Sequence, residues 1–222
     1  MNFDRANVRS SPYVGVFASL SDDYILMPIS ALPKEVKLFE KTLEAKVIKT
    51  SLAGTSLLGI LSKIVGNKAV VSSIVEDQEI KVLEKHGIEV LRLEDYTSTG
   101  NLIAMNNKAG VASPLLRDES IGELEKFLGI KFTKMRVADT DLAGACLTVT
   151  NKGFISHPNI SEENFNQLKK LFGVEGTPTT ANYGDLFVGN SVVANSKGVL
   201  VGSLTSGIEL TKIDEGLRGD LE

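Results

Sequence analysis

Cysteine and histidine, which often serve as nucleophiles, bases or metal ligands, are scarce in the sequence: it has one cysteine, Cys146, and two histidines, His86 and His157. A cysteine nucleophile requires a thiolate, which a neighbouring base or cation stabilises. Cys146 instead lies in the apolar stretch ACLTV, where a small buried side chain is expected. A single cysteine makes no disulfide within the chain and no cysteine metal cluster, and it fits a reducing compartment.

The two histidines have structural explanations. His86 precedes Gly87 at the end of an expected helix, where an imidazole suits the negative end of the helix dipole. His157 precedes Pro158 in an expected turn. The sequence has no glycine-rich phosphate loop with a lysine, no H-E-x-x-H and no G-x-S-x-G. It therefore predicts a protein that is not an enzyme and uses no cofactor or metal.

Composition narrows the class of partner. The chain has 222 residues, 42% of them hydrophobic, with a net charge of −4 and a pI near 5.4. A protein that wraps DNA through its phosphates would carry an excess of lysine and arginine, although local basic patches remain possible. The first residues lack the apolar core of a signal peptide, and no apolar stretch is long enough to cross a membrane. We expect a cytoplasmic monomer with neither a membrane nor DNA as its partner.

One segment recurs along the whole chain. Residues 100–114, GNLIAMNNKAGVASP, read as a β-hairpin whose first strand begins at Gly100 and whose turn is Asn106 to Gly110. Similar segments open at four other glycines with spacings of 44, 41, 44 and 45 residues, and the five are Gly15, Gly59, Gly100, Gly144 and Gly189. Spacing of this kind indicates a repeat architecture.

Each hairpin is followed by an amphipathic helix and a further strand. In the third and fourth copies the apolar helix positions correspond at a displacement of 44, with Asp118 and Ser161 as expected N-caps and Gly129 and Gly173 as expected stops. In the first copy Glu44 stands where such a glycine would be expected. The unit is strand, strand, helix, strand, which predicts an α+β class.

The two termini of the chain predict that the five repeats form a closed ring. Residues 3–10 occupy the place of the strand that precedes each hairpin, and the last copy is too short to supply its own final strand. The N-terminal segment should fill that gap, giving a closed ring without exposed strand edges. The prediction is one domain over residues 1–222, with five internal repeats.

These repeats, with the segments VADTDLAGACLTVTNKGFISHP and TSLAGTSLLG, resemble the translation initiation factor 6 family over essentially the whole chain. The resemblance implies a pentein-type ring, also described as a β/α propeller. It implies a factor that binds the large ribosomal subunit, prevents premature joining of the small subunit and takes part in large-subunit maturation. The chain is similar to the archaeal form, because eukaryotic members carry a longer regulatory tail.

Two alternatives remain open at this point. Pentein rings also include enzymes that act on guanidino substrates through a cysteine nucleophile, and a ring scaffold could bind some other protein. Six polar residues that lead into the hairpins are expected to point into a polar, water-filled funnel at the ring's middle. They are Thr50, Ser51, Asp139, Asp141, Thr180 and Asn182.

Two sets of repeated positions are candidates for ribosome binding. The hairpin turns carry a lysine in four copies, either to keep the turn soluble or to meet local ribosomal RNA: Lys68, Lys108, Lys152 and Lys197. The residue after each repeat glycine is mostly small or apolar, from strand packing or as a protein-docking surface: Val16, Ile60, Asn101, Ala145 and Asn190. The family resemblance favours Asn101 most strongly as a contact with a ribosomal protein, and Lys68 more weakly.

Overall fold

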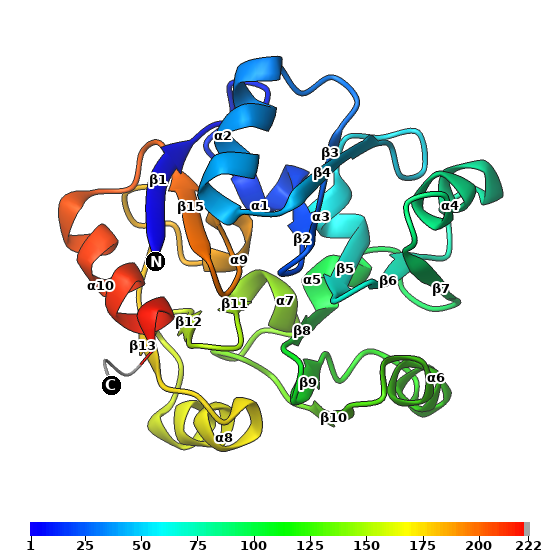
Figure 1. The fold of residues 1–222 in the computed structure, drawn as a ribbon. Coiled ribbons are helices and arrows are strands. Elements are labelled where there is room, and N and C mark those ends of the chain that lie inside the picture. The colour runs from blue at the N-terminus through cyan, green and yellow to red at the C-terminus, as the bar shows by residue number, and fades with distance from the viewer. Residues whose placement is uncertain (220–222) are drawn as a thin grey trace.

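Five three-stranded sheets, one for each repeat, are arranged around a common centre (Figure 1). The structure is a computed structural model that describes residues 1–219. In every sheet the middle strand pairs antiparallel with an inner strand and parallel with an outer strand. The expected α+β ring of five strand–strand–helix–strand units is confirmed.

The three strands of each sheet have distinct places in the ring. The inner strands are β2 (Ser19–Leu20), β5 (Ser62–Val65), β8 (Ile103–Met105), β11 (Leu147–Val149) and β14 (Val192–Ala194). The middle strands are β3 (Tyr24–Pro28), β6 (Lys68–Ser72), β9 (Ala109–Ala112), β12 (Phe154–Ser156) and β15 (Gly198–Gly202). The outer strands are β4 (Lys46–Thr50), β7 (Glu89–Leu93), β10 (Lys131–Lys134), β13 (Gly176–Pro178) and β1 (Asn2–Ala6). Because β1 pairs with β15, the first residues of the chain complete the fifth sheet.

A long helix packs against each sheet. These helices are α2 (Pro33–Leu43), α4 (Asp77–Glu84), α6 (Asp118–Leu128), α8 (Glu162–Phe172) and α10 (Gly207–Arg218). Ser161 is the N-cap of α8, and Gly129 and Gly173 end α6 and α8 in the left-handed conformation. Glu44 takes the same conformation without being glycine, with φ at 46°. Asp118 is the first helical residue of α6, not its cap.

A short helix precedes each hairpin, and the sequence did not predict these helices. They are α1 (Val14–Phe17), α3 (Leu58–Leu61), α5 (Thr99–Leu102), α7 (Ala143–Cys146) and α9 (Val188–Ser191). The repeat glycines lie inside these helices and not at the start of a strand, which corrects the expected position of Gly100. A single turn is too short to show a helical period, so tertiary packing decides its conformation.

The five repeat glycines contact one another around the ring. A methyl group on Gly59 would lie 1.8 Å from the carbonyl oxygen of Gly15, and the same relation recurs at 1.9–2.3 Å around the ring, between Gly100 and Gly59, Gly144 and Gly100, Gly189 and Gly144, and Gly15 and Gly189. Only glycine allows backbones to approach this closely. The short helices therefore form an unbroken circuit.

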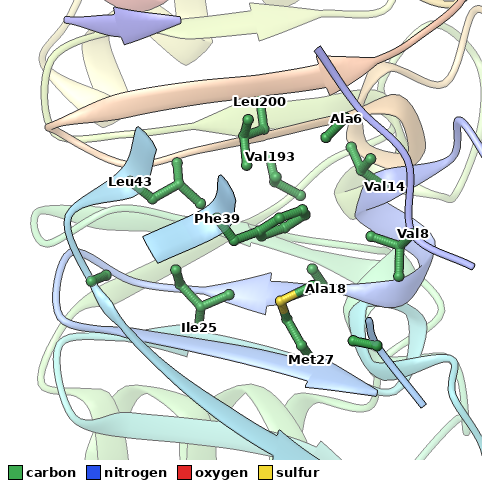
Figure 2. Close-up of a cluster of buried hydrophobic side chains, with 12 residues drawn as sticks. Ala6, Val8, Val14, Ala18, Ile25, Met27, Phe39, Leu43, Val193 and Leu200 are labelled. Atoms are coloured by element: carbon green, nitrogen blue, oxygen red, sulfur yellow. The ribbon is translucent and has the colours of Figure 1, made fainter. Parts of the chain in front are cut away.

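The hydrophobic core is divided among five clusters, several of which join neighbouring repeats. In the cluster of Figure 2, Phe39 of α2 packs with Ile25 and Met27 of its own repeat and with Val193 and Leu200 of the fifth. Ala6 and Val8, from the N-terminal segment, complete the same cluster. Each repeat thus depends on its neighbours for a buried surface.

The ring has two distinct ends. The hairpin turns lie together at one, which we call the turn end: residues 21–23, 66–67, 106–108, 150–153 and 195–197. The opposite end, which we call the loop end, carries the segments that lead into the short helices and into the long ones. Those before the short helices are 7–13, 51–57, 94–98, 135–142 and 179–187, and those before the long helices are 29–32, 73–76, 113–117, 157–161 and 203–206.

Candidate functional site

The cysteine lies in the core. Cys146 ends α7, is fully buried, and has the pKa of its thiol raised by burial. Its sulfur lies 3.4 Å from Oγ1 of Thr140 and 3.8 Å from the main-chain oxygen of Val137. A thiol with a raised pKa, beside a hydroxyl and a carbonyl, is a poor nucleophile.

The two histidines differ in their exposure to solvent. His157 is buried in the turn after β12, where its Nδ1 accepts a hydrogen bond from the N–H of Asn159 at 3.1 Å. Burial lowers its pKa, although the charge of Asp185 opposes that effect. His86 is exposed near the end of α4. Both positions agree with the structural roles expected from the sequence.

Three of the four turn lysines bind the ends of neighbouring helices. Their ammonium groups donate to main-chain oxygens at or near the C-terminus of the next repeat's long helix, at distances of 2.7–3.2 Å. The bonds run from Lys68 to Phe127, from Lys108 to Gly173 and from Lys197 to Glu44. A cation at this end of a helix also interacts favourably with the helix dipole. Lys152, the fourth, is exposed at the same end of the ring.

The residues that follow the repeat glycines all lie in the short helices, but they differ in exposure. Val16, Ile60, Asn101 and Asn190 are each partly accessible. Ala145 is only 2% exposed, so it offers almost no surface to a partner. That finding corrects the expectation for Ala145, whose short helix, AGAC, is buried throughout.

Exposed apolar side chains gather at the loop end. Among residues 1–219, every exposed large hydrophobic residue except Met1 lies in the loop-end segments or in the first turn of α10. They are Tyr13, Ile29, Leu32, Leu57, Ile74, Tyr96, Leu115, Tyr183, Leu186, Leu204 and Ile208. Single exposed hydrophobic residues are ordinary, but their concentration at one end of a molecule is typical of a protein interaction site.

Glutamate side chains at the start of the long helices hold these loops in place through hydrogen bonds. Near the start of their long helices, Glu79 and Glu209 accept hydrogen bonds from the main chain of the loop that leads into the short helix. Glu79 binds the N–H groups of Ala53 and Gly54 at 2.7 and 3.0 Å. Glu209 binds those of Tyr183 and Gly184 at 3.1 and 2.8 Å. Each carboxylate therefore stabilises a loop that exposes apolar side chains.

Both braced loops contain non-glycine residues in the left-handed conformation, with φ at 51° for Ala53 and 64° for Tyr183. Strain of this kind persists only where surrounding contacts impose it. Glu35 binds the N–H of Arg9 in the same way, at 3.1 Å. Sequence reasoning missed these glutamates, although Glu35 and Glu79 are 44 residues apart, the displacement of the first two repeat glycines.

The electrostatics of Glu209 follow from these bonds. Burial by itself would raise the pKa of its carboxyl group, but hydrogen bonds from Ser206, Thr180 and Gly184 outweigh that effect and lower the pKa to about 2. The ionised carboxylate is thus the form that the folded ring stabilises.

A partly open axial cavity of about 150 Å³ is lined by inner strands and hairpin turns. The six polar residues expected there lie instead at the loop end or at the ends of strands beside it, because they precede the short helices. Ser51 and Thr180, for example, donate hydrogen bonds to Glu79 and Glu209, each at 2.7 Å. The prediction for their position was wrong, although a cavity does lie on the axis.

Two further features concern metals and membranes. Within the part of the chain that the structure describes, no group of three or more histidine, cysteine, aspartate or glutamate side chains is placed to hold a metal ion. None of the helices over residues 1–219 is both long and apolar enough to cross a membrane.

Comparison with known proteins identifies relatives over the full ring. Residues 3–216 match the model of the eIF-6 family. Translation initiation factor 6 of Pyrococcus horikoshii is 35% identical, with 98% of this chain and 99% of the relative covered. The proteins of that name from Cenarchaeum symbiosum and Archaeoglobus fulgidus are 38% and 39% identical, covering 99% and 95% of this chain and 100% and 97% of their own.

Among solved structures, the agmatine deiminase of C. jejuni is similar at a TM-score of 0.38 and 16% identity. The similarity covers 54% of this chain and 49% of that one. At this level it supports no argument about fold or chemistry.

Proposed function

Because this chain belongs to the eIF-6 family, we propose that it is a translation factor that binds the large ribosomal subunit and prevents premature joining of the small subunit. The relatives that cover the whole ring are named as translation initiation factors from archaea. We extend the proposal to a role in maturation of the large subunit, and to action as a monomer in the cytoplasm.

The gathering of exposed apolar side chains at the loop end is the observation that supports this function best. A factor that blocks subunit joining must cover part of a surface, and it requires a docking face that is stable before the partner arrives. The carboxylates of Glu35, Glu79 and Glu209 supply that stability by holding the loops. We propose that the loop end docks on a ribosomal protein of the large subunit.

Residues of the short helices beside these loops belong to the proposed contact. They are Val16, Ile60, Asn101 and Asn190, each partly accessible. A net charge of −4 disfavours a broad contact with RNA, so docking should depend mainly on protein, with local contact to ribosomal RNA. At the loop end the exposed Arg9 is a suitable group for that contact.

The turn lysines have a different role in this proposal. Lys68, Lys108 and Lys197 use their ammonium groups to join neighbouring repeats, at the end of the ring opposite the exposed apolar residues. We propose that they stabilise the ring and do not bind RNA.

We propose that the chain is not an enzyme. The guanidino-enzyme alternative requires a thiolate nucleophile, and the buried Cys146 thiol has a raised pKa. Sedimentation of purified ribosomal subunits with and without the protein tests the proposed function. The protein should travel with large subunits and should reduce the peak of joined ribosomes.

A further inference from the structure

The axial cavity lies between the five inner strands, and it is lined by one charged residue, Lys63, that has no structural role in the ring. Its volume of about 150 Å³ suits a small molecule, since a cavity of that size takes up a molecule of roughly the size of benzene. Its walls come from all five repeats, and Gly15 and Gly189 of the glycine circuit line it as well.

Lys63 of β5 lines this cavity and is only partly accessible to solvent. It stands four residues after its repeat glycine, and the equivalent residues of the other repeats are neutral: Ser19, Ala104, Thr148 and Val193. The hydroxyls of Ser19 and Thr148 donate to main-chain oxygens of the next repeat, as a structural position requires. Lys63 is therefore the one charged residue among the five equivalent positions.

Within residues 1–219, the ammonium group of Lys63 donates no hydrogen bond to an oxygen and forms no ion pair with a carboxylate. Desolvation lowers its pKa to about 8. Shielding a cation from water without a partner is unfavourable, and Lys63 is shielded in part. An anion from solution would supply the missing charge.

The two carboxylates that line the cavity, Asp22 and Asp23, form no ion pair with the ammonium group of Lys63. Oδ1 of Asp22 accepts from the N–H of Ser196 at 2.7 Å, and its Oδ2 accepts from Oγ of Ser196 at 2.9 Å and from Nδ2 of Asn151 at 3.1 Å. The ammonium of Lys197 lies beside it, donating to its main-chain oxygen at 2.8 Å. Asp23 is exposed to solvent.

The hydrogen bond between Asp22 and Asn151 joins two hairpin turns that line the cavity. It joins the first repeat to the fourth across the turn end, and Asn151 in turn accepts from the N–H of Asn107 at 3.0 Å. Asp22, Asn107 and Asn151 all line the cavity, so this bridge forms part of its wall.

We infer that the axial cavity binds one small oxyanion of the phosphate or sulfate class, with the Lys63 ammonium group as its anchor. The inference is independent of ribosome binding, since the site lies inside the ring. The bound anion stabilises the charged form of Lys63. Affinity should therefore fall as pH rises through the pKa near 8. The other titratable groups that line the cavity are Asp22 and Asp23.

Isothermal titration with sulfate tests the site, because the charge of sulfate is constant between pH 7 and pH 9.5. At matched ionic strength the intact protein should show one saturable site at pH 7, with an affinity roughly 30-fold weaker at pH 9.5. Lys63→Met should abolish binding. Lys37→Met, at an exposed position of α2, should bind as the unaltered protein does.

Three results would overturn the inference: no saturable sulfate site in the unaltered protein, equal binding by Lys63→Met, or an affinity that does not change with pH. The folding of Lys63→Met is checked by its thermal unfolding in buffer free of sulfate and phosphate, where removal of the unpartnered cation should raise Tm.

Discussion

Gly15 and Gly189 close the ring: a methyl group on Gly15 would lie 2.0 Å from the carbonyl oxygen of Gly189. Non-bonded carbon and oxygen atoms approach to roughly 3.3 Å, so this contact admits no side chain. The two glycines belong to the first and last repeats, and their contact joins the short helices α1 and α9. The five repeats are therefore held together at the glycine circuit as well as through β1.

Gly59→Ala should destabilise the whole ring. The added methyl group would meet the carbonyl oxygens of Gly15 and Ala18 at 1.8 and 2.6 Å, and relief of the clash requires the backbone to move. We expect a loss of about 1–3 kcal/mol or more in the free energy of unfolding, measured by chemical denaturation. Gly122→Ala, in open space on α6, is the control and should stabilise by roughly 0.5–1 kcal/mol. Equal stability of Gly59→Ala and the unaltered protein would contradict the close packing of the circuit.

Deletion of residues 1–10 tests whether residues 1–222 form a single domain, as we propose. The deletion removes β1 and exposes the edge of β15, and it takes Ala6 and Val8 from the core cluster around Phe39. We expect all five repeats to lose protection together, measured by hydrogen exchange. Unfolding of the truncated chain as cooperative and as stable as that of the full chain would refute closure by the N-terminal strand.

Glu209→Gln should change how stability depends on pH. The folded-state pKa of Glu209 is about 2, below its ordinary value of 4.5, so its contribution is complete above pH 4.5 and is lost as pH falls toward 2. The unaltered protein should lose roughly 2–3 kcal/mol more than the variant over that range. Denaturant unfolding at several pH values measures the difference. Glu215→Gln, exposed on the same helix, should keep the pH profile of the unaltered protein; identical profiles for Glu209→Gln would contradict the role of the carboxylate.

Replacing Lys68, Lys108, Lys152 and Lys197 together with glutamine separates a structural role from RNA binding. We expect a lower Tm, because three helix ends lose a bound cation worth about 0.3–1 kcal/mol each. The dependence of large-subunit binding on salt should stay unchanged. A slope that flattens by roughly 0.7–0.9 for each lost contact would instead place RNA at the turn end.

The sequence predicted the architecture because the copies that resemble each other most closely also carry the clearest local signals for a helix. The helix around Leu124 and Leu128 and its copy around Leu168 and Phe172 carry both an apolar stripe and a stop glycine, and both were found. The short helices could not be predicted in this way. Gly100 lies in one turn of helix that packs closely against the main chain of Gly59, and no local sequence pattern records such a contact.

The functional surface was harder to predict than the fold. Ala145 and Asn101 are equivalent in the repeat, yet only Asn101 is accessible, because burial depends on what packs around each short helix. The turn lysines showed their regular spacing in the sequence, whereas their acceptors, main-chain oxygens of the next repeat, exist only in the folded ring. Some apolar residues of the loop end do recur in the repeat, since Ile74, Leu115 and Leu204 each lie 15 residues after their repeat glycine. Their exposure, however, is decided only by the folded ring.

The docking face can be tested by placing charge on the loop end. Ile29→Asp and Tyr183→Asp alter side chains that are 63% and 85% exposed, and aspartate tolerates the left-handed conformation of Tyr183. Both should fold normally and weaken large-subunit binding at least tenfold, about 1.4 kcal/mol. Asn101→Arg should act similarly. Asn107→Asp, exposed at the turn end, is the control and should bind normally; normal binding by the loop-end variants would mean that the other face docks.

Sedimentation of purified large and small ribosomal subunits through a sucrose gradient tests the central claim most directly. Under conditions that favour joining, the unaltered protein should travel with the large subunit and reduce the joined peak in proportion to its occupancy. Tyr183→Asp should restore that peak, and Asn107→Asp should not. A protein that stays at the top of the gradient and leaves the joined peak unchanged would contradict the proposed function, and a ring scaffold that binds another protein would then be the better account.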